Sequence, residues 1–148
     1  MDETGVEQEN LSEYGYSMRG KKIISKVSGK RLPRINIVSG KQSDKVLATA
    51  EYSGTMKARR FETWFMLFFL PLLAAGTVIV MDNARFHRKT VLHTLAQAQG
   101  CKIIFLPAYS PDLNPIEKLW ANLKNFLRLN AHKSNSVCEA IQNYFELG

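Results

Sequence analysis

The feature that most constrains the fold is an almost wholly apolar segment at residues 64–81. Its length is near the minimum for a membrane-spanning helix. However, Pro71 and the Gly76–Thr77 pair interrupt it, and its two ends differ in character. Residues 61–70 are aromatic and compatible with a helix, whereas residues 78–80 are β-branched. We therefore predict an amphipathic helix, a loop and a strand buried on both faces, rather than a spanning helix.

Other periodic segments predict strands and helices on either side of this segment. They are strands at 22–27, 34–39 and 45–52, a helix at 89–99, a strand at 102–106 and helices beginning near 116 and 136. The last helix has a capping-box pattern, with Ser136 followed three residues later by Glu139. An antiparallel meander followed by strand, helix, strand and helix predicts a mixed α/β sheet with helices on its faces.

The chain has 148 residues, which suits a single domain over 1–148, and a formal net charge of +7. This charge favours anionic partners, nucleic acid first. No acidic residue occurs between Glu13 and Asp44, although this stretch is rich in basic residues. They are Arg19, Lys21, Lys22, Lys26, Lys30, Arg31, Arg34 and Lys41. The stretch is either a nucleic-acid-binding surface or simply the solvated face of a hairpin.

The cysteines and histidines do not form a recognisable zinc or disulfide pattern. Cys101 and Cys138 are too few and too far apart for a disulfide framework or a CxxC site. The three histidines have neither i,i+4 pairing nor an HExxH pattern. We therefore do not expect zinc.

Asp82 stands out because it follows the predicted buried strand directly. Open α/β sheets place ligand sites at the carboxyl ends of their strands, where side chains leave the core. An aspartate in this place is also typical of a turn or a helix cap, with no chemical role. The local pattern leaves both interpretations open.

Glu117 lies in a proline-rich segment that leads into a predicted helix. Asn114 is suited to cap this helix, Pro115 to occupy its first position, and Glu117 to occupy its third. This is a complete structural explanation. A carboxylate fixed behind two prolines is equally a well-held metal ligand.

Two longer motifs surround these carboxylates. Residues 81–87 read MDNARFH, and residues 106–120 read LPAYSPDLNPIEKLW. With Asp2 they give the order Asp, Asp, Glu, with thirty-four residues between Asp82 and Glu117. In these motifs the chain resembles transposases of bacterial insertion sequences in the mariner superfamily, which belong to the DDE endonucleases. The resemblance extends over nearly the whole chain.

The resemblance implies a ribonuclease H-like fold with three antiparallel strands, two parallel strands and flanking helices. It implies that Asp2, Asp82 and Glu117 are the catalytic residues and metal ligands. Two Mg²⁺ or Mn²⁺ ions, held by such oxygen ligands, would assist in-line displacement at phosphorus. The activity implied is cleavage of phosphodiester bonds at transposon ends, followed by joining of the 3′-hydroxyl to target DNA.

The implied partner is double-stranded DNA, in the cytoplasm of a bacterium and associated with its nucleoid, with no role for a membrane. Asn83 and His87 are candidates to position a carboxylate or contact the cut strand, although His87 is equally compatible with an exposed place on a helix. Phosphate contacts are expected from basic residues. They are Lys21, Lys22, Lys26, Lys30, Arg31, Lys118, Lys124 and Arg128.

The chain departs from the family at its start. Only Met1 precedes Asp2, so we expect the first central strand to be largely missing and Asp2 to be poorly held. No helix-turn-helix DNA-binding domain precedes it, which predicts an N-terminally truncated protein. A homodimer on DNA, or a separate N-terminal DNA-binding polypeptide, would then complete it. Two alternatives are an inactive relic that binds DNA non-specifically and a small membrane protein.

Overall fold

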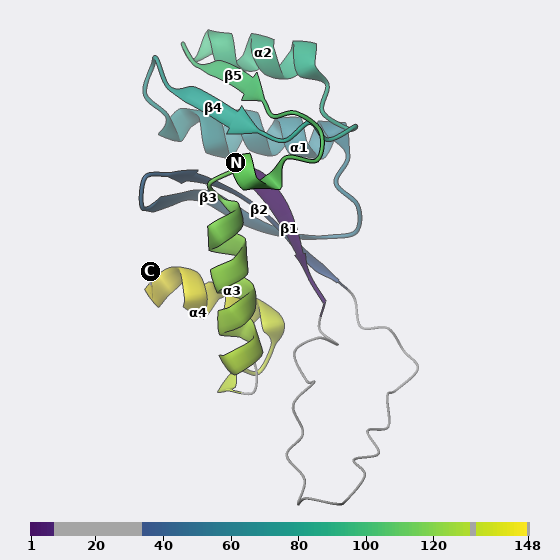
Figure 1. Cartoon of the computed structure of the whole chain (residues 1–148), viewed down its shortest axis with the longest axis vertical. Helices are drawn as coiled ribbons and strands as arrows, with labels where there is room; N and C mark the ends of the chain where they lie inside the picture. Colours follow the sequence, from purple (N-terminus) through teal and green to yellow (C-terminus); the bar gives the residue numbers. More distant parts are fainter. Residues whose placement is uncertain (8–33, 131–132, 148) are drawn as a thin grey trace, which may run out of the picture.

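The computed structural model describes residues 1–7, 34–130 and 133–147. The predicted strand at 22–27 lies outside these residues. The same is true of five predicted DNA contacts, which are Lys21, Lys22, Lys26, Lys30 and Arg31. The described elements are arranged as a mixed α/β structure (Figure 1).

The first three strands form an antiparallel sheet in the order β1-β2-β3. The strands are β1 (Asp2–Val6), β2 (Ile35–Gln42) and β3 (Lys45–Ser53). A two-residue turn joins β2 to β3, with Ser43 at a φ of 53°. The register shifts between Val38 and Gly40. At Gly40 an added Cβ would lie 2.1 Å from Cε2 of Phe69, so only glycine allows this ring to pack against the sheet.

A second, parallel sheet is made of β4 (Val78–Met81) and β5 (Lys102–Phe105). Helix α2 (Lys89–Ala98) connects them and ends beside Gly100, whose φ of 74° suits the turn after a helix. Ile79 and Met81 are buried against the core, as the β-branched sequence predicts. The predicted strand, helix and strand are all present. The expectation that the first strand is buried on both faces is wrong, because Val78 is 50% exposed on the face opposite to Ile79 and Met81.

The long apolar segment forms a helix, as predicted, with an irregular second half. It consists of α1 (Ala58–Trp64), the π-helical turn η2 (Phe65–Phe69) and the 3-10 turn η3 (Leu70–Leu72). Buried aromatic rings face the sheets, and Phe61 and Phe65 stack with centroids 6.0 Å apart. Among the residues that the structure describes, no helix has the length and apolarity needed to cross a bilayer.

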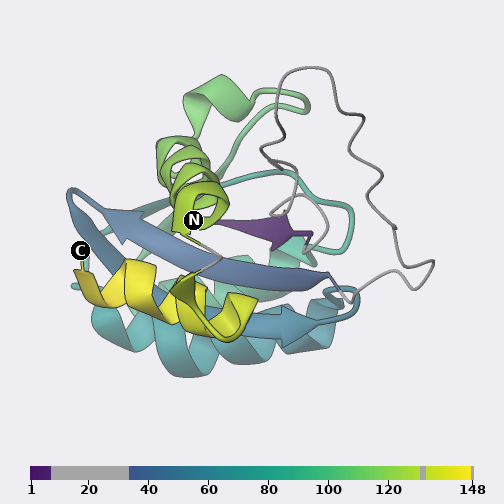
Figure 2. The same cartoon turned by 90° about the horizontal axis from the view of Figure 1, so that it is seen from below.

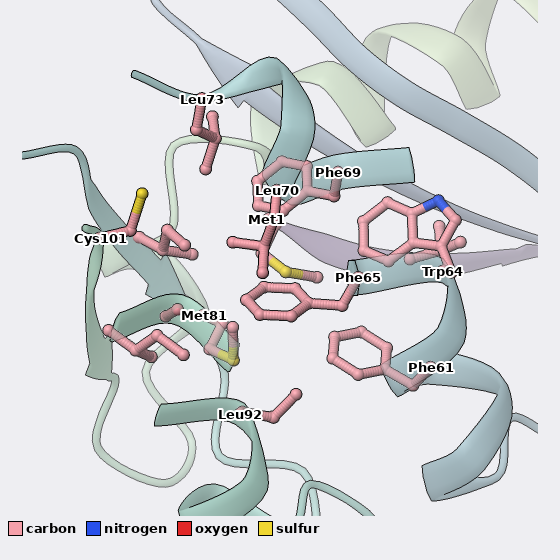
Figure 3. Close-up of a cluster of buried hydrophobic side chains, with 14 of the residues drawn as sticks. Met1, Phe61, Trp64, Phe65, Phe69, Leu70, Leu73, Met81, Leu92 and Cys101 are labelled. Atoms are coloured by element: carbon pink, nitrogen blue, oxygen red, sulfur yellow. The ribbon is translucent and has the colours of Figure 1, made fainter. Parts of the chain in front are cut away.

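Two hydrophobic cores lie on opposite faces of the antiparallel sheet. One is formed mainly by α1, η2, β4 and α2 (Figure 3), and Met1 is buried within it. The other is formed by α3 (Glu117–Asn130) and α4 (Val137–Leu147) against β1 and β2 (Figure 2). Trp120 is only 2% exposed in the second core.

The first strand differs from the expectation that it would be largely missing. Five residues from Asp2 onward form β1, in a register that runs from Asp2 opposite Ser39 to Val6 opposite Ile35. Asp2 is therefore tied to the sheet, and the expectation that it would be poorly held is wrong. Ahead of it lies Met1, whose amino group donates a hydrogen bond of 2.8 Å to the Val80 carbonyl. Strand pairing on one side and burial of Met1 on the other hold this end of the chain.

Candidate active site

Three acidic residues that are far apart in the sequence line one open cavity of about 600 Å³. Asp2 begins β1, Asp82 directly follows β4, and Glu117 is the first residue of α3. The same cavity is lined by the loop after β5, including Pro107 and Tyr109. The fold thus brings together the three carboxylates that the sequence singled out.

The carboxylates influence one another electrostatically. The pKa of Asp2 is raised to about 6, mainly because the side chain is partly buried and also because Asp82 and Glu117 are negatively charged nearby. A backbone hydrogen bond to Glu3 opposes this shift. Three acids that share one partly desolvated space create a negative potential that a cation would offset.

Glu3 is a fourth acidic residue of this cavity, which the sequence analysis missed. Burial, followed by the charges of Asp82 and Asp2, raises its pKa to about 8. Its Oε1 is buried without a hydrogen-bond partner among the described residues. The only local signal was that Glu3 is acidic and adjacent to Asp2. Successive side chains of a strand point to opposite faces, so this adjacency alone did not predict that Glu3 would reach the cavity.

Asp82 is held by His87. His87 Nε2 lies 3.0 Å from Asp82 Oδ1, and with the hydrogen on Nε2 the ring donates to the carboxylate. The His87 side chain is 2% exposed and that of Asp82 is 48% exposed. The ring packs at 4.4 Å, centroid to centroid, from both Phe61 and Phe86. The alternative of an exposed helical position for His87 is therefore wrong, because the residue is buried and precedes α2.

The loop between β4 and α2 is anchored at its far end as well. Arg88 Nε donates a hydrogen bond of 2.7 Å to Glu62 Oε1 on α1. A second nitrogen of the guanidinium bonds the other oxygen of the same carboxylate. This two-point contact and the buried His87 ring fix both the end of the loop and the orientation of Asp82.

Asn114 lies at the boundary of the site and is 4% exposed. The sequence predicted that it would cap α3, but its Oδ1 is buried without a partner among the described residues, so this prediction is wrong. The helix start is instead stabilised by the backbone, where the Glu117 amide donates to the Asn114 carbonyl at 3.1 Å. The unpaired amide oxygen is left beside the carboxylates.

The carboxylates line a common cavity without forming a ready coordination sphere. Within residues 1–7, 34–130 and 133–147, no group of three or more His, Cys, Asp or Glu side chains is close enough together to hold a metal ion. The chemistry of the donors nevertheless fits a hard divalent cation, because they are carboxylate and amide oxygens on one partly buried surface.

Several residues with a possible role in binding DNA surround this cavity. Asn83 and Arg85 are exposed and line it, and Tyr109 is fully exposed at its rim with a φ of 59°. Arg85 and Tyr109 were missed in the sequence analysis. The predicted phosphate contacts on α3 are exposed there, and they are Lys118, Lys124 and Arg128. One basic residue, Arg85, and one aromatic residue, Tyr109, thus line the acidic cavity, and the three basic residues of α3 lie outside its lining.

The acidic cavity lies where strand β4 ends, and the carboxyl ends of strands are where open α/β folds commonly bind ligands. The chain belongs to the DDE superfamily endonuclease family, whose model matches residues 1–139. The match spans all four acidic residues of the cavity. No curated protein matches the chain.

Membership in the family agrees with the architecture. An antiparallel sheet and a parallel pair, flanked by helices, form the ribonuclease H-like arrangement of a DDE domain. The domain is thus of the nuclease or transposase type, with DNA as its substrate. Endonucleases of this superfamily generally use divalent metal ions.

Proposed function

We propose that this domain is the catalytic part of a transposase from a bacterial insertion sequence of the mariner superfamily. In this proposal it cleaves phosphodiester bonds at transposon ends and joins the freed 3′-hydroxyl to target DNA. The observation that carries the proposal is the meeting of Asp2, Asp82 and Glu117 at one cavity in a chain of this family. The protein would act in the cytoplasm, at the nucleoid.

Asp2, Asp82 and Glu117 are proposed to hold two Mg²⁺ or Mn²⁺ ions. Such ions, when bound, would stabilise the attacking and leaving oxygens of the displacement. The raised pKa of Asp2 supports this assignment, because a carboxylate destabilised by burial, and to a lesser degree by the charges of Asp82 and Glu117, would be stabilised by a bound cation. His87 acts as a positioning residue by fixing one oxygen of Asp82.

The surrounding residues would orient the DNA. Arg85, which lines the cavity, and Lys118, which is exposed on α3 next to Glu117, are proposed to contact phosphates. Asn83 is proposed to contact the cut strand, and Tyr109 offers an exposed ring on which a displaced base can stack. A homodimer on DNA is the proposed assembly at the transposon ends.

The proposal is tested by nicking of supercoiled plasmid in buffers that contain Mg²⁺, Mn²⁺ or EDTA. The wild-type chain is compared with Asp82→Asn and Glu117→Gln, and Asp112→Asn is the matched control, since Asp112 is exposed on η4 (Pro111–Leu113). The expected result is metal-dependent nicking that both site variants abolish and the control retains. Salt-sensitive DNA binding with no metal-dependent nicking by the wild type would instead favour the non-catalytic DNA-binding alternative.

A further inference from the structure

The acidic cavity by itself would repel a nucleic acid. Within the described part of the chain four carboxylic acids line it, and Arg85 is the one basic residue among the lining side chains. The phosphates on either side of a bond placed there are negatively charged, so binding needs cations just outside the cavity. Arginines that meet this need lie beside it on the antiparallel sheet.

Arg34, immediately before β2, is the first of these cations. Its guanidinium lies over Gly5 of β1, where the Cβ of any other residue would overlap it. Because side chains alternate along a strand, this is the face of β1 toward which Glu3 points, two residues before Gly5. Glu3 lines the acidic cavity. The guanidinium is therefore close to the cavity, on the same face of the sheet.

Arg60, near the start of α1, is the second cation. Gly5, Asn36 and Tyr52 form a row across the three strands, because Asn36 is paired with both of the others. The guanidinium carbon of Arg60 lies 5.9 Å from the centroid of the Tyr52 ring, and its Nη1 donates a hydrogen bond of 3.1 Å to the Ser53 carbonyl. Neighbouring strands are about 4.8 Å apart, so the row is about 10 Å long. A guanidinium group thus lies at each end of one row.

The electrostatics of Tyr52 show that this row and the acidic site interact. The pKa of its hydroxyl is raised to about 12, first by burial and then by the charge of Glu3, while Arg34 and Arg60 oppose the shift. One hydroxyl is therefore within range of a carboxylate of the cavity and of both guanidinium groups. In the described part of the chain the salt bridges join other residues, so both arginines lack a carboxylate partner.

Next to Tyr52 the surface is hollowed into a groove of about 460 Å³ between β3 and α1. The exposed Arg59 and Arg60 line it together with Tyr52. Other lining side chains are mostly apolar and include the buried Trp64, whose indole nitrogen already donates to the Ala48 carbonyl at 2.7 Å. The groove therefore continues the line of positive charge away from the acidic site.

We propose that Arg34, Tyr52 and Arg60 form a track that binds the phosphate backbone of the DNA strand next to the bond placed in the acidic cavity. This inference rests on the proposed function, because that function brings DNA to the cavity. Both guanidinium groups are already held, one over Gly5 and the other over the Tyr52 ring. Little side-chain freedom is then lost when they meet phosphates. The two arginines contact the phosphates, and Tyr52 positions Arg60.

The test is binding of the full chain to a fluorescein-labelled DNA duplex, followed by anisotropy at several salt concentrations in the presence of EDTA. Because EDTA removes divalent ions, binding is measured without cleavage. Arg34→Gln and Arg60→Gln are compared with the wild type and with Lys45→Gln. Lys45 is exposed at the opposite end of β3 from Tyr52, so this control removes the same charge at a distance from the track.

Each track variant should lose one phosphate contact. We expect the affinity at about 0.1 M salt to fall roughly five- to tenfold, and the slope of log K against log salt to become less steep by about 0.9. Lys45→Gln should keep the wild-type slope, and Arg60→Lys, which keeps the charge, should recover most of it. If Arg60 only braced Ser53 and Tyr52, Arg60→Gln would lower the free energy of unfolding and leave the salt slope unchanged.

The proposal is overturned if the wild type does not bind the duplex, or if either track variant keeps the wild-type salt slope. It is equally overturned if Lys45→Gln changes the affinity as much as the track variants do. Nicking by the wild type with Mg²⁺ is assayed separately. Absence of nicking, together with the expected effects on binding, would overturn the catalytic proposal and leave the DNA track in place.

Discussion

His87 Nε2 lies 3.0 Å from Asp82 Oδ1, and the imidazole that makes this contact is almost fully buried between two phenylalanine rings. The carboxylate, by contrast, is half exposed at the cavity. A rigid, buried donor thus orients a solvent-facing acceptor at the end of a parallel strand. This arrangement is typical of a residue that positions a metal ligand.

If His87 positions Asp82, a His87→Phe variant should bind metal more weakly without losing stability. Phenylalanine keeps the ring contacts but removes the hydrogen bond to Asp82, and it also removes the unpartnered buried Nδ1. We expect folding to be retained and Mn²⁺ affinity to fall by roughly 10–100-fold, as measured by calorimetric titration. His93→Phe, at an exposed position on α2, is the control. Unchanged Mn²⁺ affinity in His87→Phe would show that the hydrogen bond does not organise the site.

The buried Glu3 predicts an unusual dependence of stability on pH for the metal-free protein. Its pKa is raised from the ordinary 4.5 to about 8 in the folded state, so the folded protein binds the proton more tightly than the unfolded chain does. Protonation of Glu3 therefore stabilises the folded state relative to the unfolded chain. This stabilisation is fully present below about pH 4.5 and is lost as the pH rises through about 8. Glu3→Gln should therefore raise the free energy of unfolding at pH 8, by on the order of a few kcal/mol, and leave it nearly unchanged at pH 4.

Urea denaturation at the two pH values measures this difference. Glu146→Gln, at an exposed position near the end of α4, should show little change at either pH. If Glu3→Gln changed the free energy of unfolding equally at pH 4 and pH 8, the effect of the substitution would not come from the ionisation of a buried carboxylate.

The contact between Gly40 and Phe69 predicts a specific steric conflict. An added methyl group would meet the ring at 2.1 Å, so Gly40→Ala should lower the free energy of unfolding by about 1–3 kcal/mol. In the double variant with Phe69→Leu, part of this loss should be recovered, because the smaller side chain leaves room for the methyl group. Strictly additive effects in this cycle, measured by denaturation, would contradict direct packing of the two residues.

Tyr109 combines full exposure with a left-handed backbone conformation, at a φ of 59°. Glycine adopts this conformation without strain, so Tyr109→Gly should leave stability unchanged or slightly higher. If the ring stacks on a base, the same change should weaken binding of single-stranded DNA by roughly tenfold. Tyr109→Phe should bind normally, because the ring is kept. Fluorescence anisotropy at fixed salt measures these affinities, and equal affinity of all three proteins would exclude stacking.

Local sequence signals predicted those parts of the fold that depend on neighbouring residues. The capping box before α4 is an example, since the Glu139 amide donates to Ser136 Oγ at 3.1 Å. The presence of strand β4 and of the helix of the apolar segment was likewise evident from residue type and period, although the burial of β4 on both faces was not confirmed. Asp82 could be placed at a strand end for the same reason.

Features that depend on contacts between distant segments could not be predicted. The burial of His87 requires Phe61 from α1, twenty-six residues earlier in the chain. The perturbed pKa of Glu3 arises from burial and from the charge of Asp82, neither of which has a local signature. The strength with which β1 is held was underestimated because the pairing with β2 and the burial of Met1 are tertiary contacts.

The most direct test of the proposed function is the location of Mn²⁺ by anomalous scattering in crystals soaked with the ion. The account predicts manganese in the acidic cavity, with oxygens of Asp82 and Glu117 about 2.0–2.3 Å from a shared ion or from two adjacent ions, and with Asp2 among the ligands. Manganese bound elsewhere, or held by Asp82 and Glu117 at separate, unconnected positions, would contradict it.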